Sequence, residues 1–127
     1  MSWSTRPEDL ILTVKKEHQK LVKDMVAFVW VQVTTSSPVD TGRYAGNHNV
    51  SSGVPNGSYN YNKTNPSKSV DLGRVEVTVG DDSFRTFWVS NGLPYAEALE
   101  NGHSQRAPRG VYGPAFALAS HRLRSRT

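Results

Sequence analysis

Hydrophobic residues recur every three or four positions through the first quarter of the chain. One stripe runs from Ile11 to Phe28, and a second joins it in the later half: Val22, Val26, Val29 and Val33. This is the period of an amphipathic helix. Pro7, followed by two acids that favour the positive end of a helix dipole, marks its start. Residues 36–38 mark its end, because the residue before Pro38 is pushed out of the α region.

The segment 26–33 is rich enough in β-branched residues to favour a strand by propensity. The spacing of three and four nevertheless continues through it, so we predict one helix of roughly seven turns. Its apolar face widens along the helix, which indicates that the second half is covered on two sides.

A period of two appears further along the chain. In residues 72–79, Val75, Val77 and Val79 alternate with polar side chains. Residues 80–83 are typical of a turn, and residues 84–89 are expected to form the second strand after it. This pattern predicts a β-hairpin. We also predict an edge strand over 44–50. Between them, about 51–70, lies a polar loop without periodicity, whose length is typical of functional or disordered segments.

The last third of the chain predicts two more helices. A short one follows Pro94 and ends after Glu100, where Asn101 and Gly102 form a stop signal. A C-terminal one starts near Gly113 and has apolar residues at near-helical spacing. The expected fold is therefore α+β: a single domain in which a long N-terminal helix packs on a small antiparallel β-sheet, with a short helix and a C-terminal helix.

Composition narrows the class of protein. The chain has 127 residues, enough for one modest core, and no cysteine, which excludes disulfides and thiolate chemistry and fits synthesis in a reducing cytosol. No run approaches the length of a membrane span, and the first residues lack the basic and apolar regions of a secretion signal. We expect a protein without a membrane partner.

The net charge of +4 is placed unevenly. No acid follows Glu100, whereas five arginines do: Arg106, Arg109, Arg122, Arg124 and Arg126. Such a basic tail is typical of a segment that contacts phosphates or an acidic surface, and equally of a solvated chain end. Tyr59 and Tyr61 in the polar loop are able to stack on bases. A basic nucleic-acid-binding module is therefore one hypothesis.

The residues do not indicate catalysis. Glu97, Glu100 and His103 are three apart and would share a face of an unbroken helix, as a divalent metal site requires, but Asn101 and Gly102 interrupt that helix. No histidine stands in a recognisable nucleophile or base context, and no phosphate-binding loop occurs. We expect no enzyme, no metal and no cofactor.

Two blocks of sequence together resemble one family. Residues 37–44, SPVDTGRY, resemble the P-V-D-T-G-R-L block of neck or tail-completion proteins of tailed bacteriophages. Residues 89–110, VSNGLPYAEALENGHSQRAPRG, are similar to the same family's N-x-L-P-Y-A-x-x-L-E-x-G-x-S-x-x-A-P-x-G block. The blocks occur in the family's order and at a fitting separation. Tyr44 replaces the usual leucine, and the polar loop is outside the pattern.

The resemblance implies a structural virion protein at the head-tail junction, made in the cytoplasm of a bacterial host. It implies a ring of copies, expected to be a hexamer, that joins the head connector to the tail around the DNA channel. The implied partners are the adjacent connector or stopper and the tail terminator or tail-tube proteins, with non-specific contact to DNA in the lumen. A tail terminator that caps the tail tube is an alternative.

The second block is then expected to be a structural corner. Pro94 and Gly102 would set the ends of the short helix, and Tyr95 and Leu99 would anchor it on the sheet. Across both blocks, the interface or structural candidates are Asp40, Gly42, Arg43, Pro94, Tyr95, Glu97, Leu99, Glu100, Gly102, Arg106 and Arg109.

The charged members of this set have expected partners. The turn that contains Arg43 is expected to lie close to the second block, with Arg43 paired to Glu97 or Glu100. Arg106 and Arg109 would face acids of a neighbouring subunit or DNA in the lumen.

Overall fold

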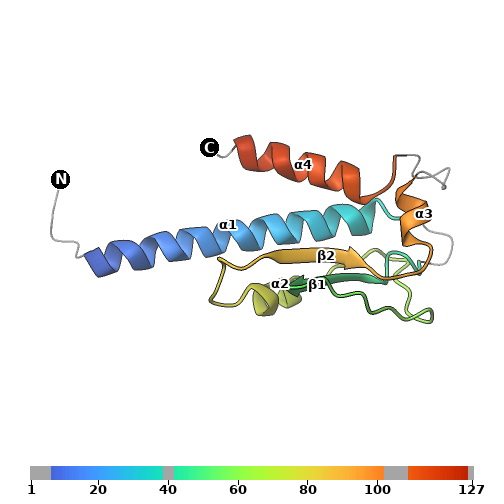
Figure 1. The fold of residues 1–127 in the computed structure, drawn as a ribbon, viewed down its shortest axis with the longest axis horizontal. Coiled ribbons are helices and arrows are strands. Elements are labelled where there is room, and N and C mark those ends of the chain that lie inside the picture. Colours follow the sequence, from blue (N-terminus) through green and yellow to red (C-terminus); the bar gives the residue numbers. More distant parts are fainter. Residues whose placement is uncertain (1–6, 39–41, 102–108, 126–127) are drawn as a thin grey trace.

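A computed structural model describes residues 7–38, 42–101 and 109–125, with side chains from Lys15 onward. These residues form four helices and a two-stranded antiparallel sheet, so the predicted α+β class is confirmed (Figure 1). None of the described helices combines the length and the apolar character needed to cross a bilayer. In chain order the elements are α1 (Pro7–Thr35), β1 (His48–Ser52), α2 (Leu72–Val79), β2 (Phe87–Asn91), α3 (Ala96–Glu100) and α4 (Tyr112–Ser125).

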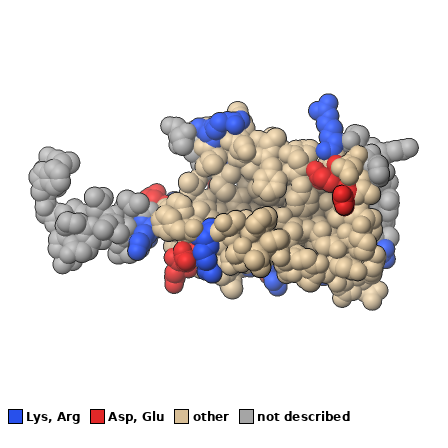
Figure 2. All heavy atoms as spheres, in the orientation of Figure 1, with Lys and Arg blue, Asp and Glu red and all other residues tan. Residues whose placement is uncertain are grey.

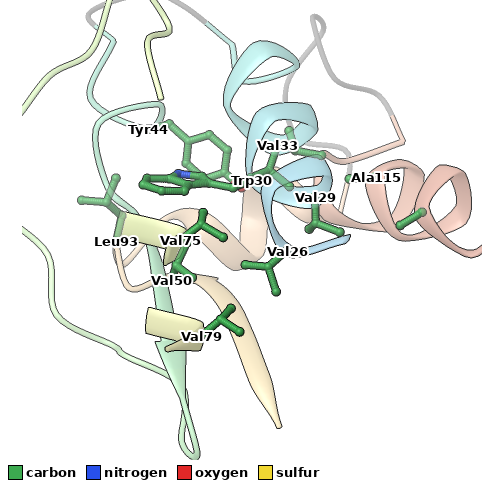
Figure 3. Close-up of a cluster of buried hydrophobic side chains, with 12 residues drawn as sticks. Val26, Val29, Trp30, Val33, Tyr44, Val50, Val75, Val79, Leu93 and Ala115 are labelled. Atoms are coloured by element: carbon green, nitrogen blue, oxygen red, sulfur yellow. The ribbon is translucent and has the colours of Figure 1, made fainter. Parts of the chain in front are cut away.

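Helix α1 is the central element of the fold. In Figure 1, α4 runs along one side of it, and the two strands with α2 lie along the other side. The buried core contains side chains of α1, of the elements that lie on both sides of α1, and of the loop before α3 (Figure 3). Its members are Val26, Val29, Trp30, Val33, Tyr44, Val50, Val75, Val79, Leu93, Val111, Ala115 and Ala119.

The long N-terminal helix is confirmed, including the segment 26–33 with its high strand propensity. The second apolar stripe provides the core: Val33 is fully buried and Val26 is 9% exposed. Met25 and Phe28 of the first stripe are partly buried against that core. Burial of a continuous helical face outweighs the small helix cost of β-branched residues, as is usual when tertiary packing and local propensity disagree.

The predicted β-hairpin is wrong, because residues 72–79 form helix α2. The side chain of Asp71 caps this helix by accepting a hydrogen bond from the Gly73 amide at 3.0 Å. Val75 and Val79, one turn apart, are buried, whereas Val77 between them is 83% exposed. The three valines satisfy a period of two, but only Val75 and Val79 also satisfy a helical spacing of four, and the cap together with one-sided burial selects the helix.

Strand β2 pairs with β1, in antiparallel register from His48 opposite Asn91 to Ser52 opposite Phe87. The predicted edge strand therefore starts at His48 rather than Tyr44. Residues 42–47 form a tight turn instead, in which the Gly46 amide donates to the Gly42 carbonyl at 3.0 Å. The predicted return strand over 84–89 is shifted to 87–91, and its partner is 35 or more residues earlier in the chain.

Helix α4 docks on α1 through small side chains and one charged contact. Ala115 and Ala119 are buried in the core. Arg122 donates to the Asp24 carboxylate of α1 at 3.3 Å, and its guanidinium lies 4.9 Å from the ring centroid of Phe28. The predicted short helix and C-terminal helix are both present, and the polar loop has no helix or strand from residue 53 to residue 71.

Candidate functional site

The described residues of the two sequence blocks meet at one end of the fold. The Asn91 side-chain amide donates to the Tyr44 carbonyl at 3.0 Å, and its Oδ1 accepts from the Leu93 amide at 3.1 Å. The rings of Tyr44 and Tyr95 are 6.5 Å apart at their centroids. Tyr44 and Leu93 are each 3% exposed. We call this region the corner: residues 37–48 without the undescribed positions, residues 91–100, and residues 110–113 at the start of α4.

A buried chain of polar groups crosses the corner. Ser37 Oγ lies 2.5 Å from the Val33 carbonyl oxygen and 2.7 Å from Nε2 of His48, and Nδ1 of His48 lies 2.6 Å from the Tyr112 hydroxyl. The Val33 carbonyl is only an acceptor, so the single Ser37 proton is donated to it. Nε2 of His48 then donates to Ser37, and Nδ1 accepts from Tyr112.

The protonation states agree with this arrangement. Burial lowers the pKa of His48 to about 3, against a minor opposing contribution from the Val33 backbone, so the imidazole is neutral near pH 7. Burial also raises the pKa of the Tyr112 hydroxyl, followed in size by the repulsion of nearby Tyr44 and Glu100, so that hydroxyl keeps its proton. Each group in the chain therefore has the state that its neighbour requires.

A serine beside a histidine is also the geometry of nucleophilic catalysis, which requires the histidine to accept the serine proton. Here the Ser37 proton is directed at a carbonyl, and the histidine nitrogen facing Ser37 is the donor. Ser37 is 1% exposed and His48 is 5% exposed, so both side chains are buried. The arrangement satisfies buried polar groups and holds α1, β1 and α4 together.

Glu100, the last residue of α3, caps the N-terminus of α4. Its Oε1 accepts from the amides of Val111 at 2.9 Å and Tyr112 at 2.8 Å, and its Oε2 accepts from the Gly113 amide at 2.8 Å. Burial alone would raise the pKa of Glu100, but these three hydrogen bonds outweigh it and lower the pKa. Gly110, at φ +79°, is required here because a Cβ would lie 2.5 Å from the Glu100 carbonyl oxygen.

The turn at residues 42–47 also organises the long polar loop. Asn47 is 3% exposed, and its Nδ2 donates to the carbonyls of Arg43, Asn60 and Lys63 at 2.8, 3.1 and 3.2 Å. Its Oδ1 accepts from the Asn60 amide at 2.7 Å. Gly42, at φ +78°, approaches the loop so closely that a Cβ would lie 2.6 Å from the Pro66 nitrogen. The loop is thus tied to the corner.

Arg43 faces this loop. Its Nε donates to the Tyr61 carbonyl at 2.7 Å, and its guanidinium lies 5.4 Å from the centroid of the Tyr61 ring. The Glu100 carboxylate is engaged by the start of α4, as described above. The pairing of Arg43 with Glu97 or Glu100 stays a prediction.

The other sequence candidates have different surroundings. Tyr95 and Leu99 are partly buried against the core, while Pro94, Glu97 and Arg109 are exposed. Asp40, Gly102, Arg106 and the candidate ligand His103 lie outside the described residues. Within the described part of the chain, no three acidic or histidine side chains are placed to hold a metal ion.

Sequence reasoning missed the residues that join the corner across long distances. Asn47, His48 and Tyr112 belong to neither quoted block, and no local pattern marks them. Asn91, in contrast, was visible as the first residue of the N-x-L-P-Y motif, although its bond to the Tyr44 carbonyl was not.

Comparison with protein-family models, with curated proteins and with solved structures yields no match to this chain.

Proposed function

We propose that this protein is a structural component of a tailed bacteriophage virion, a neck or tail-completion subunit that forms a ring between head connector and tail. One observation carries the proposal. The described parts of the two sequence blocks that resemble that family, separated by more than forty residues, meet in a single corner in which Asn91 bonds the Tyr44 carbonyl. A chance resemblance of two unrelated segments would not require them to be in contact.

The corner suits a ring subunit for a physical reason. A closed ring requires every copy to present its contact surfaces at the same angle, because a small rotation would open the ring into a helix. In the corner, Glu100 bonds the first turn of α4, and the His48 chain connects α4 to α1 and β1. These bonds hold the outer helix at a defined angle to the rest of the subunit.

The nucleic-acid-binding hypothesis gains less from the structure. The rings of Tyr59 and Tyr61 pack edge to face with centroids 5.4 Å apart, and the guanidinium of Arg43 lies over Tyr61. A base that stacked on Tyr61 at that face would have to displace Arg43. The tail terminator remains the alternative position within the virion, and the two blocks favour the neck.

Gold labelling of particles tests the proposal. An antibody to this chain is applied to intact phage particles from the source lysate and to heads and tails separated from them, with pre-immune serum as the control. We expect label at the head-tail junction of intact particles and on the head after separation. Label at the upper end of isolated tails would indicate a terminator. Label confined to unassembled protein, with clean particles, would exclude a virion role.

A further inference from the structure

Asparagine is followed directly by glycine three times in the chain, at Asn56, Asn91 and Asn101. In such a pair, the backbone nitrogen of the glycine is able to attack the side-chain carboxamide carbon of the asparagine. Glycine favours this attack because it has no Cβ to hinder the approach or to restrict the backbone rotation that the approach needs. Gly102, the partner of Asn101, lies outside the described residues, so the structure compares the other two pairs.

Asn56 lies in an exposed turn of the polar loop, with its side chain folded over the glycine that follows. Its Oδ1 accepts a hydrogen bond from the Ser58 amide at 3.0 Å, which closes a turn around Gly57. This is the one hydrogen bond of the Asn56 side chain among the described residues. Asn56 and Gly57 are both exposed, and a Cβ placed at Gly57 would meet no atom within 4 Å. Water therefore reaches this pair, and its carboxamide nitrogen is not held.

Asn91 has the same turn in a different environment. Its Oδ1 accepts from the Leu93 amide at 3.1 Å, and Gly92 is the residue between them. Its Nδ2, however, donates to the Tyr44 carbonyl at 3.0 Å, and Asn91 is partly buried at the end of β2. The carboxamide nitrogen is the leaving group of the reaction, so a bond that holds it in the corner opposes the attack.

Asn60 provides the complementary comparison in the same loop as Asn56. It is exposed, and its Oδ1 accepts from the Asn62 amide at 2.8 Å, so the turn is again the same. The residue that follows is Tyr61 instead of glycine. Its side chain hinders the approach of the backbone nitrogen. Of these three asparagines, Asn56 alone combines the turn, a following glycine and an exposed carboxamide.

We propose that Asn56 is a site of spontaneous modification, at which the folded chain acquires aspartate and isoaspartate. The Gly57 nitrogen forms a bond to Cγ of Asn56, and the carboxamide nitrogen leaves as ammonia, together with the proton of the Gly57 amide. A cyclic imide remains. Water then adds to either carbonyl of this imide and breaks one of its two ring carbon–nitrogen bonds. One water is consumed and one ammonia is released, and no group is oxidised or reduced. The modification does not depend on the proposed virion role.

Either product changes the tip of the polar loop. Residues 51–62 contain no charged side chain, and the lower right of the surface in Figure 2, where this loop lies in Figure 1, is largely uncharged. The reaction places a carboxylate there. In isoaspartate the main chain also runs through Cγ, which displaces the Asn56 carbonyl that accepts from Ser90 at 2.9 Å and from Asn49 at 3.3 Å. These two bonds tie the loop tip to β2 and β1, so isoaspartate loosens the tip from the sheet.

Mass spectrometry of the full chain during incubation tests the proposal. The purified folded protein is kept in heavy-oxygen water at mildly alkaline pH, and the peptides that contain Asn56, Asn60 and Asn91 are followed over time. The heavy oxygen marks the conversions that occur during the incubation, and backbone fragmentation distinguishes aspartate from isoaspartate. A second sample, unfolded in urea, gives the rates without the structure.

Two variants accompany the wild type. Gly57→Ala is the test variant, because a Cβ at this position meets no atom within 4 Å, so that the fold is retained. Val54→Ala is the matched control, because Val54 is 72% exposed in the same loop and takes no part in the reaction. Circular dichroism checks the fold of both variants.

In the folded chain we expect Asn56 to react roughly tenfold faster than Asn91 or more, while Asn60 stays intact over the same period. Val54→Ala reacts like the wild type, and Gly57→Ala reacts roughly tenfold more slowly at Asn56. In urea, Asn56 and Asn91 react at similar rates, because the hydrogen bonds that distinguish them are lost.

Three results would overturn the proposal. The first is a folded chain whose Asn56 is intact after a period in which the unfolded chain has reacted. The second is an equal or faster reaction at Asn91 in the folded chain. The third is a folded Gly57→Ala variant that reacts at Asn56 as fast as the wild type.

Discussion

The corner and the outer sides of α4 and α2 differ in how completely their side chains are satisfied inside one subunit. In the corner, polar side chains such as His48 and Glu100 make several hydrogen bonds each, and apolar ones such as Tyr44 and Leu93 are buried. On α4 and α2, Phe116 and Val77 are more than half exposed. The first region needs no partner to be stable, whereas the second leaves apolar surface in water.

This difference separates residues that shape the subunit from residues that leave apolar surface exposed. The described residues of both blocks lie in or beside the corner, and Asn91, Leu93 and Glu100 act within the chain. Phe116 and Val77 lie outside the blocks. The two blocks therefore identify the scaffold of the subunit and carry no information about these exposed apolar side chains.

The largest effect on stability is expected from Trp30→Ala. Trp30 is 9% exposed in the core beside the corner, so truncation leaves a large cavity and lowers the free energy of unfolding by roughly 3–5 kcal/mol. Trp88→Ala is the matched control, because Trp88 is 40% exposed on β2. Urea denaturation of the two variants checks the difference. Equal losses would contradict the assignment of the core.

A smaller loss is expected from Glu100→Gln. The amide side chain lacks the charge and presents only one acceptor oxygen to the three α4 amides, so we expect a loss of about 1.5–3 kcal/mol. Glu97→Gln, an exposed position in the same helix, should change the free energy of unfolding by less than about 0.5 kcal/mol. Slower amide exchange at Tyr112 in Glu100→Gln than in wild type would be inconsistent with the cap.

The pH dependence of stability reports on His48. Because its pKa falls from 6.5 to about 3 on folding, the unfolded chain binds a proton there between these values and the folded chain does not. Stability is therefore full above pH 6.5 and falls with falling pH, by about 1.4 kcal/mol per unit for this one group.

Thermal unfolding between about pH 6.5 and pH 5 measures the contribution of His48 to the pH dependence of stability. Glu100 contributes only at lower pH. The lowered pKa of Glu100 acts in the same direction, but from its ordinary value of 4.5 downward. His48→Asn should flatten the pH profile over the upper range. An unaltered slope in His48→Asn would refute the buried neutral imidazole.

The smallest effect on stability is expected at exposed apolar positions of α4 and α2. Phe116→Arg and Val77→Arg should each change the free energy of unfolding by no more than about 0.5 kcal/mol, since Phe116 is 51% exposed and Val77 is 83% exposed. Chemical denaturation checks this. A loss comparable to that of Glu100→Gln would mean that these two side chains stabilise the subunit, and the contrast with the corner would disappear.

Much of the fold could be predicted from local signals. The spacing of apolar residues predicted α1 through its valine-rich half, and Asn101 with Gly102 predicted the end of α3. The corner was predicted only as a resemblance. Its connections include pairs that are 11 and 64 positions apart, Ser37 with His48 and His48 with Tyr112, and no local pattern encodes such pairs.

The sequence by itself determined the helices whose periodicity allows one interpretation and whose ends are marked by proline, asparagine or glycine. The tertiary structure decided the state of residues 72–79, because their alternation suits a strand while Val75 and Val79 also lie one helical turn apart. Burial of these two valines in the core, together with the Asp71 cap, selects the helix. It also decided the pairing of β1 with β2. Strand pairing depends on which segments the core brings together, and that is a property of the whole chain.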